Sequence, residues 1–199
     1  EINEPVDLII FSIPREEMVQ AMEEAGKAGI KAAVVITAGF RERDEEGAKI
    51  EKEMVKTAQK YSMRFLGPNT MGIMTPTFNA TFTFADVKPG NIAIVAQSGG
   101  MGAYMLNWAQ RTRTGLSYFV GLGNQADIKE IDVFEFLSND PQAKSIFSYM
   151  EGISDGERFL NEMPEITVKK PIVFLKGGAS GAGEQAIRTH TGSLAGSYE

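Results

Sequence analysis

The sequence predicts an α/β fold made of two doubly wound parallel-sheet domains. Short apolar runs alternate with amphipathic, helix-like runs along most of the 199 residues, which is typical of parallel sheets with helices on their faces. Several of the apolar runs end in glycine-rich or small-residue turns. The chain is long enough for one large or two small domains with their own cores.

The amino-acid composition excludes several classes of protein. The formal net charge of −6 disfavours a general nucleic-acid surface and an anionic membrane surface. The chain has no cysteine, which excludes disulfides and thiol catalysis and favours a cytoplasmic protein. No apolar run approaches the ~18 residues of a membrane span. We therefore expect neither a nucleic-acid partner nor a membrane partner.

The first domain is expected at residues 1–85. Its predicted strands are 7–13, 32–37 and 64–66, and its predicted helices are 14–29 and 44–61. The charged stretch Arg41–Lys60 reads as a solvated face. Residues 75–90 have turn chemistry with little helical period, so the domain boundary is placed near residue 85. The three strand units resemble the second half of a Rossmann-type domain whose first half is missing.

The second domain is expected at residues 86–199. Its predicted strands are 91–96, 116–122, 145–150 and 171–175, and its predicted helices are 101–113, 132–138 and a broken helix, interrupted at Pro164, that runs to Lys169. Trp108 falls on the apolar side of its helix and is expected in the core. The chain opens at Glu1 without a methionine and ends just after a glycine-rich motif, so we expect part of a longer polypeptide.

Four loops of the second domain follow predicted strand ends, where open parallel sheets bind their ligands. They are residues 97–100, 121–124, 151–152 and 176–178. Ser98, Gly99 and Gly100 lie between a strand and a helix, so their backbone N–H groups would face a phosphate at the helix N-terminus. The alternative is an ordinary strand-to-helix turn with Ser98 as the N-cap.

His190 is the only histidine, and small or hydroxyl-bearing residues surround it in THTGSLAG (189–196). Such a segment leaves backbone N–H groups open to an anion, and imidazole can act as a nucleophile or base near pH 7. Glu151 ends an apolar strand and could fix one ring nitrogen of His190; otherwise it is a solvated carboxylate. The strand-end loops of the first domain suit a nucleotide-like ligand or reflect loop geometry alone; they are Ser12-Ile13-Pro14, Thr37-Ala38-Gly39 and the turn around Asn69.

Six segments occur in an order and spacing that resemble one known family. They are GPNTMG (67–72), IVAQSGGMG (94–102), GLGNQADI (121–128), YMEGI (149–153), LKGGASGAG (175–183) and THTGSLAG (189–196). The whole chain resembles the NDP-forming acyl-CoA synthetases, in the ADP-forming acetate–CoA ligase branch of the succinyl-CoA synthetase superfamily. The resemblance implies the end of a Rossmann-like CoA-binding domain followed by most of a flavodoxin-like CoA-ligase domain.

The resemblance also implies a reaction, acyl-CoA + phosphate + ADP ⇌ carboxylic acid + CoA + ATP, through an acyl phosphate and a phosphohistidine. His190 would carry the phosphoryl group, Glu151 would support it, and Ser98, Gly99 and Gly100 would bind phosphate. The residues implied at the CoA site are Ser12, Ile13, Pro14, Thr37, Ala38, Gly39 and Asn69. The implied ligands are CoA, a small carboxylic acid, ATP or ADP, and Mg²⁺. An ATP-grasp domain or subunit would hold the nucleotide and Mg²⁺, so no metal site is expected in this chain, and the enzyme would be an oligomer.

Two departures and two alternatives accompany this interpretation. Thr70 stands where the family commonly has cysteine, which puts a role for that thiol in doubt, and Thr189 replaces a usual serine. One alternative is a non-catalytic CoA- or acyl-CoA-sensing module attached to another activity, such as a protein lysine acetyltransferase. Relatives of that kind tend to lose the phosphorylated histidine, whereas His190 is present here. The other alternative is a structural α/β subunit, which leaves an intact catalytic loop unexplained.

Overall fold

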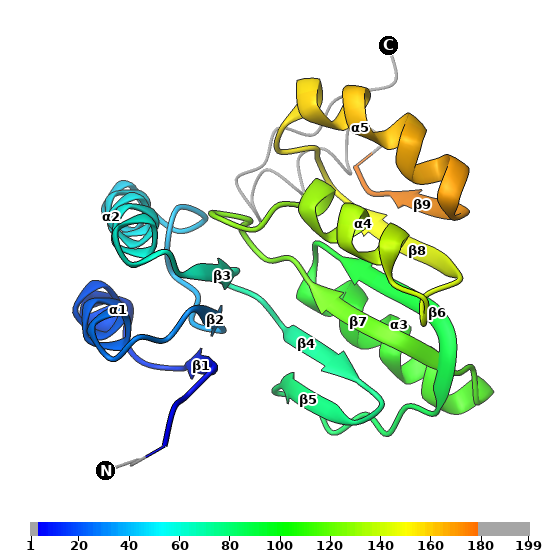
Figure 1. Ribbon diagram of the computed structural model, residues 1–199, viewed down its shortest axis with the longest axis horizontal. Coiled ribbons are helices and arrows are strands. Elements are labelled where there is room, and N and C mark those ends of the chain that lie inside the picture. The colour runs from blue at the N-terminus through cyan, green and yellow to red at the C-terminus, as the bar shows by residue number, and fades with distance from the viewer. Residues whose placement is uncertain (1–3, 179–199) are drawn as a thin grey trace.

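The first of two sheets is small and entirely parallel. The computed structural model describes residues 4–178, and Figure 1 shows the two sheets side by side. The first sheet has the order β1-β2-β3. Its elements are β1 (Leu8–Phe11), α1 (Met18–Lys27, after a 3₁₀ turn at Arg15–Glu17), β2 (Ala32–Val35), α2 (Glu45–Tyr61) and β3 (Arg64–Leu66).

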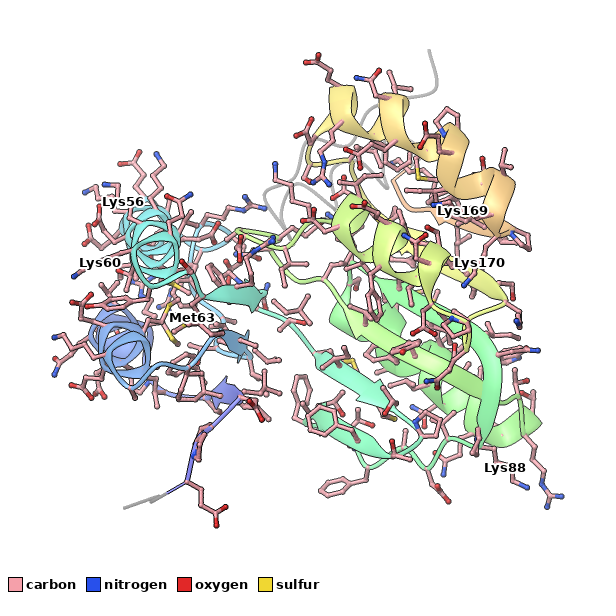
Figure 2. The ribbon with its side chains drawn as sticks, in the orientation of Figure 1. Lys56, Lys60, Met63, Lys88, Lys169 and Lys170 are labelled. Atoms are coloured by element: carbon pink, nitrogen blue, oxygen red, sulfur yellow. The ribbon has the colours of Figure 1, made fainter. Side chains whose placement is uncertain are left out.

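Helices α1 and α2 lie together on one face of this sheet (Figure 1). Between them and the strands is a core rich in methionine, an unbranched side chain that fills irregular gaps; its members include Phe11, Met18, Met22, Val35, Met54, Met63 and Phe65. Figure 2 shows Met63 beside the two helices, whereas Lys56 and Lys60 extend outward from α2. The amphipathic pattern of α2 therefore has a buried face as well as the solvated one expected from its charges.

The second sheet has six strands in the order β5-β4-β7-β6-β8-β9. Strands β6, β7, β8 and β9 are parallel to one another, while β4 is antiparallel to β5 and β7. The elements are β4 (Gly72–Thr75), β5 (Phe78–Thr81), β6 (Pro89–Ala96), α3 (Gly99–Thr112), β7 (Leu116–Gly121), α4 (Glu130–Asn139), β8 (Ser145–Met150), α5 (Gly156–Lys169) and β9 (Ile172–Lys176). The α/β architecture expected from the sequence is confirmed.

The central strand β6 is apolar on both sides because helices cover both faces of the sheet. Ala93 and Val95 belong to the core that α4 and α5 complete. Ile94 and Ala96 belong to the core on the opposite face, against α3. Figure 1 shows α3 behind the sheet and α4 and α5 on its other side. The sheet is thus doubly wound, as predicted.

The β4–β5 hairpin is the largest difference from the predicted elements. The sequence predicts turns in residues 75–90, because proline, threonine and asparagine obscure the strand pattern there. In the structure, Pro76 and Thr77 form the hairpin turn, and β4 hydrogen-bonds to β7 of the second sheet. The hairpin therefore adds two antiparallel strands at the edge of the parallel sheet. The expected boundary near residue 85 follows this hairpin along the chain and stays a prediction.

Two further expectations were wrong. Helix α5 continues through Pro164 rather than breaking. Pro164 is exposed, so the Leu160 carbonyl that loses its helical partner can face water instead. Trp108 is 48% exposed rather than in the core, because Met105, Leu106 and Ala109 form the buried face of α3. Trp108 lines an apolar pocket of about 430 Å³.

The loop after β7 joins the two sheets. It runs beside β3 and the following turn, and three of its backbone N–H groups donate to backbone carbonyls there. These bonds run from Asn124 to Pro68 (2.8 Å), from Ala126 to Gly67 (3.0 Å) and from Ile128 to Phe65 (3.3 Å). Asp127 adds an ion pair to Arg64 (2.9 Å) and accepts from the Phe65 N–H (2.8 Å).

None of the helices within residues 4–178 is both long and apolar enough to cross a membrane.

Gly123 makes this close approach possible and provides a test of it. Its φ is +60°, and an added Cβ would lie 2.3 Å from the Pro68 carbonyl oxygen. Gly123→Ala should therefore lower the free energy of unfolding by more than the ~1–2 kcal/mol of the left-handed conformation alone. Gly29→Ala is the matched control, because Gly29 has a φ of +88° with no atom near the added Cβ. Equal losses in chemical denaturation would contradict the tight junction.

Candidate functional site

The carboxyl ends of β6 and β8 lie side by side at the point where the strand order reverses. From β6 the chain first adds β7 on one side and later β8 on the other. Ligands of open α/β sheets bind at such switch points. Gln97 and Ser98 follow β6 directly, and Glu151 follows β8 directly. The structure therefore brings together two of the four loops singled out in the sequence at the expected place.

The Ser98-Gly99-Gly100 turn begins helix α3 and is open in front. The Ser98 Oγ accepts from the Met101 N–H at 3.4 Å, so Ser98 is indeed the N-cap. Among residues 4–178, a Cβ added at Gly99 would meet no atom within 4 Å, and one at Gly100 only the Ser98 Oγ at 3.9 Å. The first N–H groups of a helix have no intrahelical acceptor. This turn can therefore cap the helix and still admit an anion to its backbone.

Glu151 is buried, not solvated. It is 3% exposed, and its Oε2 has no hydrogen-bond partner among residues 4–178. Its Oε1 accepts only a long hydrogen bond from the Tyr149 hydroxyl (3.5 Å), and burial together with the nearby Glu151 charge raises the pKa of Tyr149. A buried carboxylate oxygen without a donor is costly. The geometry thus leaves Glu151 ready to accept one more hydrogen bond.

Lys176 and Gly177 connect the end of β9 to the same edge. The Lys176 Nζ donates to the backbone carbonyl of Glu151 at 2.9 Å, and the Gly177 N–H donates to that of Met150 at 2.8 Å. The described chain ends at Gly178, so His190 lies outside the described residues. The expected pairing of His190 with Glu151 is a prediction that the described residues leave open.

The strand-end loops of the first domain meet on one edge of the first sheet. The Thr37 hydroxyl donates to the Ile13 carbonyl at 2.7 Å, and the Asn69 N–H donates to the Thr37 carbonyl at 2.9 Å. Ser12, Pro14 and Ala38 are exposed beside them. The structure therefore gathers the seven residues implied at the CoA site into one surface.

A buried polar cluster centred on Asn124 connects this surface to the second domain. The Asn124 Nδ2 donates to Glu42 Oε2 at 2.6 Å and to Glu51 Oε2 at 2.9 Å. The Asn69 Nδ2 donates to the Asn124 Oδ1 at 3.3 Å, and the Arg41 guanidinium donates to the Asn124 carbonyl. We name Arg41, Glu42, Glu51, Asn69 and Asn124 the junction cluster. Sequence reasoning missed it, since Asn124 lies 73 positions from Glu51 along the chain.

The two carboxylates of the junction cluster have opposite pKa shifts. Burial raises the pKa of Glu51, which is only 5% exposed, and the nearby Glu42 charge adds to the effect. For Glu42, burial acts in the same direction, but hydrogen bonds from Asn124 and from the N–H groups of Gly39 and Phe40 hold its pKa below the ordinary value. Glu42 thereby links the Gly39 backbone of the first domain to the Asn124 loop of the second.

The fold and the site define a class of protein. It is a two-sheet α/β protein with a helix N-terminus and a buried carboxylate at a switch point, and with strand-end loops gathered on the adjoining sheet. Residues 1–76 match the family described as CoA binding domain, and residues 89–199 match the one described as Succinyl-CoA ligase like flavodoxin domain. The chain belongs to this succinyl-CoA ligase-like family.

Individual relatives agree with this assignment. The alpha subunit of acetate–CoA ligase [ADP-forming] I from Pyrococcus furiosus is 44% identical over 199 residues, which are 99% of this chain and 43% of that protein. The 4-hydroxybutyrate–CoA ligase [ADP-forming] of Nitrosopumilus maritimus is 40% identical over 205 residues, covering 100% of this chain and 29% of that protein. The chain thus spans less than half the length of these relatives.

A solved structure shares the whole fold. The dinucleotide-forming acetyl-coenzyme A synthetase 1 of Ca. Korarchaeum cryptofilum, in complex with phosphate and ADP, superposes with a TM-score of 0.92 at 37% identity. The match covers 99% of this chain and 43% of that one. The order of two α/β units expected from the sequence is therefore that of a known synthetase.

Gly99→Ala tests the anion site without disturbing the fold. The added methyl has free space and alanine favours helix, so stability should be unchanged or higher by up to ~1 kcal/mol. The methyl would, however, stand in front of the backbone N–H groups, so titration calorimetry should show phosphate binding weakened at least ~10-fold, or ~1.4 kcal/mol. Gly156→Ala, at the same position of α5 and equally unobstructed, should bind phosphate normally. Unchanged binding by Gly99→Ala would contradict the site.

Glu51→Gln tests the electrostatics of the junction cluster. Because the folded-state pKa of Glu51 is raised, its contribution to stability is fully present below the ordinary value of 4.5 and is lost as pH rises through the folded-state value. The free energy of unfolding of Glu51→Gln, relative to wild type, should therefore increase from acidic to neutral pH. Glu53→Gln, on the exposed side of the same helix, should show no such trend. If the free energy of unfolding of Glu51→Gln relative to wild type instead falls as pH rises, the raised pKa of Glu51 is refuted.

Proposed function

We propose that this chain is the CoA-binding and phosphoryl-relay part of an ADP-forming acyl-CoA synthetase, an acid–thiol ligase. The enzyme interconverts acyl-CoA, phosphate and ADP with carboxylic acid, CoA and ATP. One observation carries the proposal. The buried Oε2 of Glu151, which has no partner within the described part of the chain, lies at the same switch point as the helix N-terminus at Gly99 and Gly100. An anion site beside an acceptor for an imidazole N–H suits a phosphohistidine.

Three steps balance the reaction. A phosphate oxygen attacks the thioester carbonyl carbon, the carbon–sulfur bond breaks, and CoA leaves as its thiolate, which takes up a proton. A ring nitrogen of His190 then attacks the phosphorus of the acyl phosphate, and the phosphorus–oxygen bond breaks to release the carboxylate. Finally, the phosphorus–nitrogen bond breaks as an oxygen of ADP accepts the phosphoryl group. Dividing the transfer in this way lets two separate sites share one group.

The chain's own groups hold and orient the reactants. The N–H groups of Gly99 and Gly100, at the positive end of the α3 dipole, would bind the phosphoryl oxygens and stabilise the charge that develops on them. Glu151 Oε2 would accept the N–H of one ring nitrogen of His190. That bond fixes the tautomer and leaves the other nitrogen free to attack. Positioning of this kind accounts for most of the catalysis in phosphoryl transfer.

CoA is assigned to the surface formed by Ser12, Ile13, Pro14, Thr37, Ala38, Gly39 and Asn69, and it supplies the thiol. The residues present fit an anionic, phosphate-bearing ligand. Gly39 has a φ of +100°, and the side-chain atoms nearest to a Cβ added there belong to Arg15 and Arg43, at 3.5–3.8 Å. Arg15 pairs with Asp44, and the Gly39 N–H donates to Glu42. The exposed Arg43 side chain is therefore the cation offered to a phosphate at this place.

The Thr70 side chain has a structural role in the GPNTMG turn. It is buried, its hydroxyl donates to the Gly121 carbonyl, and it accepts from the Gly72 N–H at 3.0 Å. The hydroxyl therefore links the GPNTMG turn to the end of β7. A threonine in place of the common cysteine supplies two hydrogen bonds at the junction of the sheets.

Other parts of the proposal concern partners. An ATP-grasp domain or subunit would hold ATP or ADP together with Mg²⁺, and the whole enzyme would be cytoplasmic and oligomeric. The relative from Pyrococcus furiosus carries the name of an alpha subunit, which supports a division of the enzyme into parts. A phosphoryl group held at the switch point would have to travel to that partner, and His190 would carry it.

The test is intact-protein mass spectrometry of the complete enzyme, with its ATP-grasp part, after incubation with Mg-ATP. We expect an acid-labile gain of one phosphoryl group that is absent from His190→Asn. Glu151→Gln should slow phosphorylation by about 10- to 100-fold, the usual cost of losing the partner of a working histidine. Glu157→Gln, an exposed carboxylate at the start of α5, is the control and should match wild type.

No phosphoryl gain in the wild-type enzyme, with binding of acyl-CoA intact, would overturn the synthetase proposal. That result would favour the CoA-sensing module instead. Phosphorylation that persists in His190→Asn would place the phosphoryl group on a different residue.

A further inference from the structure

The side chain of Gln97 spans the switch point between β6 and β8. Gln97 follows β6 directly, and its backbone N–H donates to the Tyr149 carbonyl of β8 at 3.0 Å. Its Oε1 accepts from the N–H of Glu151 at 2.7 Å and from that of Gly152 at 3.1 Å. The residue is 7% exposed. Gln97 therefore holds the segment that carries Glu151, one residue before the anion-binding turn.

These two bonds fix which way the amide points. A glutamine amide has one oxygen that accepts and one NH₂ group that donates. Two backbone N–H groups converge on Oε1, so a flipped amide would set donors against donors. The NH₂ group must therefore point away from the Glu151 and Gly152 backbone.

Nothing among residues 4–178 accepts a hydrogen bond from this NH₂ group. Within that range, the side-chain polar atoms that are both fully enclosed and unpartnered are the Ser117 Oγ, the Ser148 Oγ and the Glu151 Oε2. The Gln97 Nε2 is not one of these fully enclosed atoms. A largely buried donor without an acceptor in the described part of the chain is a group that a ligand or water can satisfy.

We propose that Gln97 is a phosphoryl-positioning residue, whose Nε2 donates to an oxygen of the phosphate or acyl phosphate bound at the N-terminus of α3. This inference rests on the proposed function and adds a side-chain donor to the backbone N–H groups of Gly99 and Gly100. Through Oε1, the same amide sets the position of Glu151. One side chain thereby aligns the phosphoryl group with the partner of the histidine that attacks it.

A neutral donor suits this place better than a charged one. The Glu151 carboxylate lies on one side, and the Lys176 ammonium donates to the Glu151 carbonyl from β9. A neutral amide can donate to a phosphoryl oxygen without forming an ion pair with Glu151, which must stay available for imidazole. A glutamate at this position could accept the same two backbone hydrogen bonds but could not donate, and its charge would repel phosphate.

The oxygen of the Gln97 amide accepts hydrogen bonds and its NH₂ group donates them. A variant that keeps only the acceptor therefore tests the proposal. In the complete enzyme, Gln97→Glu keeps the acceptor and removes the donor. We expect its thermal midpoint to stay within a few degrees of wild type, while kcat/KM for phosphate falls about 100-fold. The KM for acyl-CoA should change less than about twofold, because the CoA surface is on the other domain. Unchanged phosphate kinetics in Gln97→Glu would overturn the inference, because both the lost donor and the added charge should weaken phosphate binding.

Gln97→Met covers the case in which the glutamate variant does not fold. Methionine removes the donor without adding charge, so KM for phosphate should still rise about 10-fold with KM for acyl-CoA unchanged. Equal phosphate kinetics in Gln97→Met and wild type would overturn the inference. If wild-type enzyme neither consumes phosphate nor gains a phosphoryl group from Mg-ATP, the proposed function fails as well. If wild type does both and the variants match it, the Gln97 inference alone fails.

Discussion

The structure depends on one backbone junction, where the loop after β7 hydrogen-bonds along β3 and the turn that follows it. This contact brings the carboxyl ends of two separate parallel sheets to one region of the molecule. Gly123 allows the backbones to approach, and the junction cluster around Asn124 satisfies the polar groups buried between them. Asn69 belongs both to this cluster and to the loops assigned to CoA, and Glu42 accepts from the Gly39 N–H of those loops. The position of the proposed CoA surface therefore depends on the second domain.

The switch point of the second sheet gives this arrangement its chemistry. Two neighbouring parallel strands deliver a helix N-terminus and a buried carboxylate to the same place, and Gln97 sets the spacing between them. Neither group is unusual alone, since Ser98 caps its helix as many serines do. Their combination is informative because the Glu151 Oε2 lacks a partner in the described chain. An unsatisfied buried acceptor calls for an explanation, and a catalytic role that supplies the missing donor is one such explanation.

The sequence predicted the parts of this structure that local chemistry determines. Short strand-like runs located β3 and β8 with their observed limits, and the turns after the predicted strands located the ligand-binding edge. Prediction failed where partners are distant in the chain. The β4–β5 hairpin is stabilised by pairing with β7. Asn124 lies in one of the four loops expected at the ligand-binding edge, but its side chain donates to Glu51 of α2. The sequence pattern did not predict a role for the Gln97 side chain, because that role depends on the backbone groups that the side chain contacts in the folded chain.

The most direct test of the central claim is a structure of the complete enzyme with inorganic phosphate bound. The account predicts phosphate at the N-terminus of α3, about 3 Å from the N–H groups of Gly99 and Gly100 and from the Gln97 Nε2. It also predicts that Glu151 Oε2 accepts a hydrogen bond from a ring nitrogen of His190. Phosphate bound away from this turn, or Glu151 paired with a residue other than His190, would contradict it.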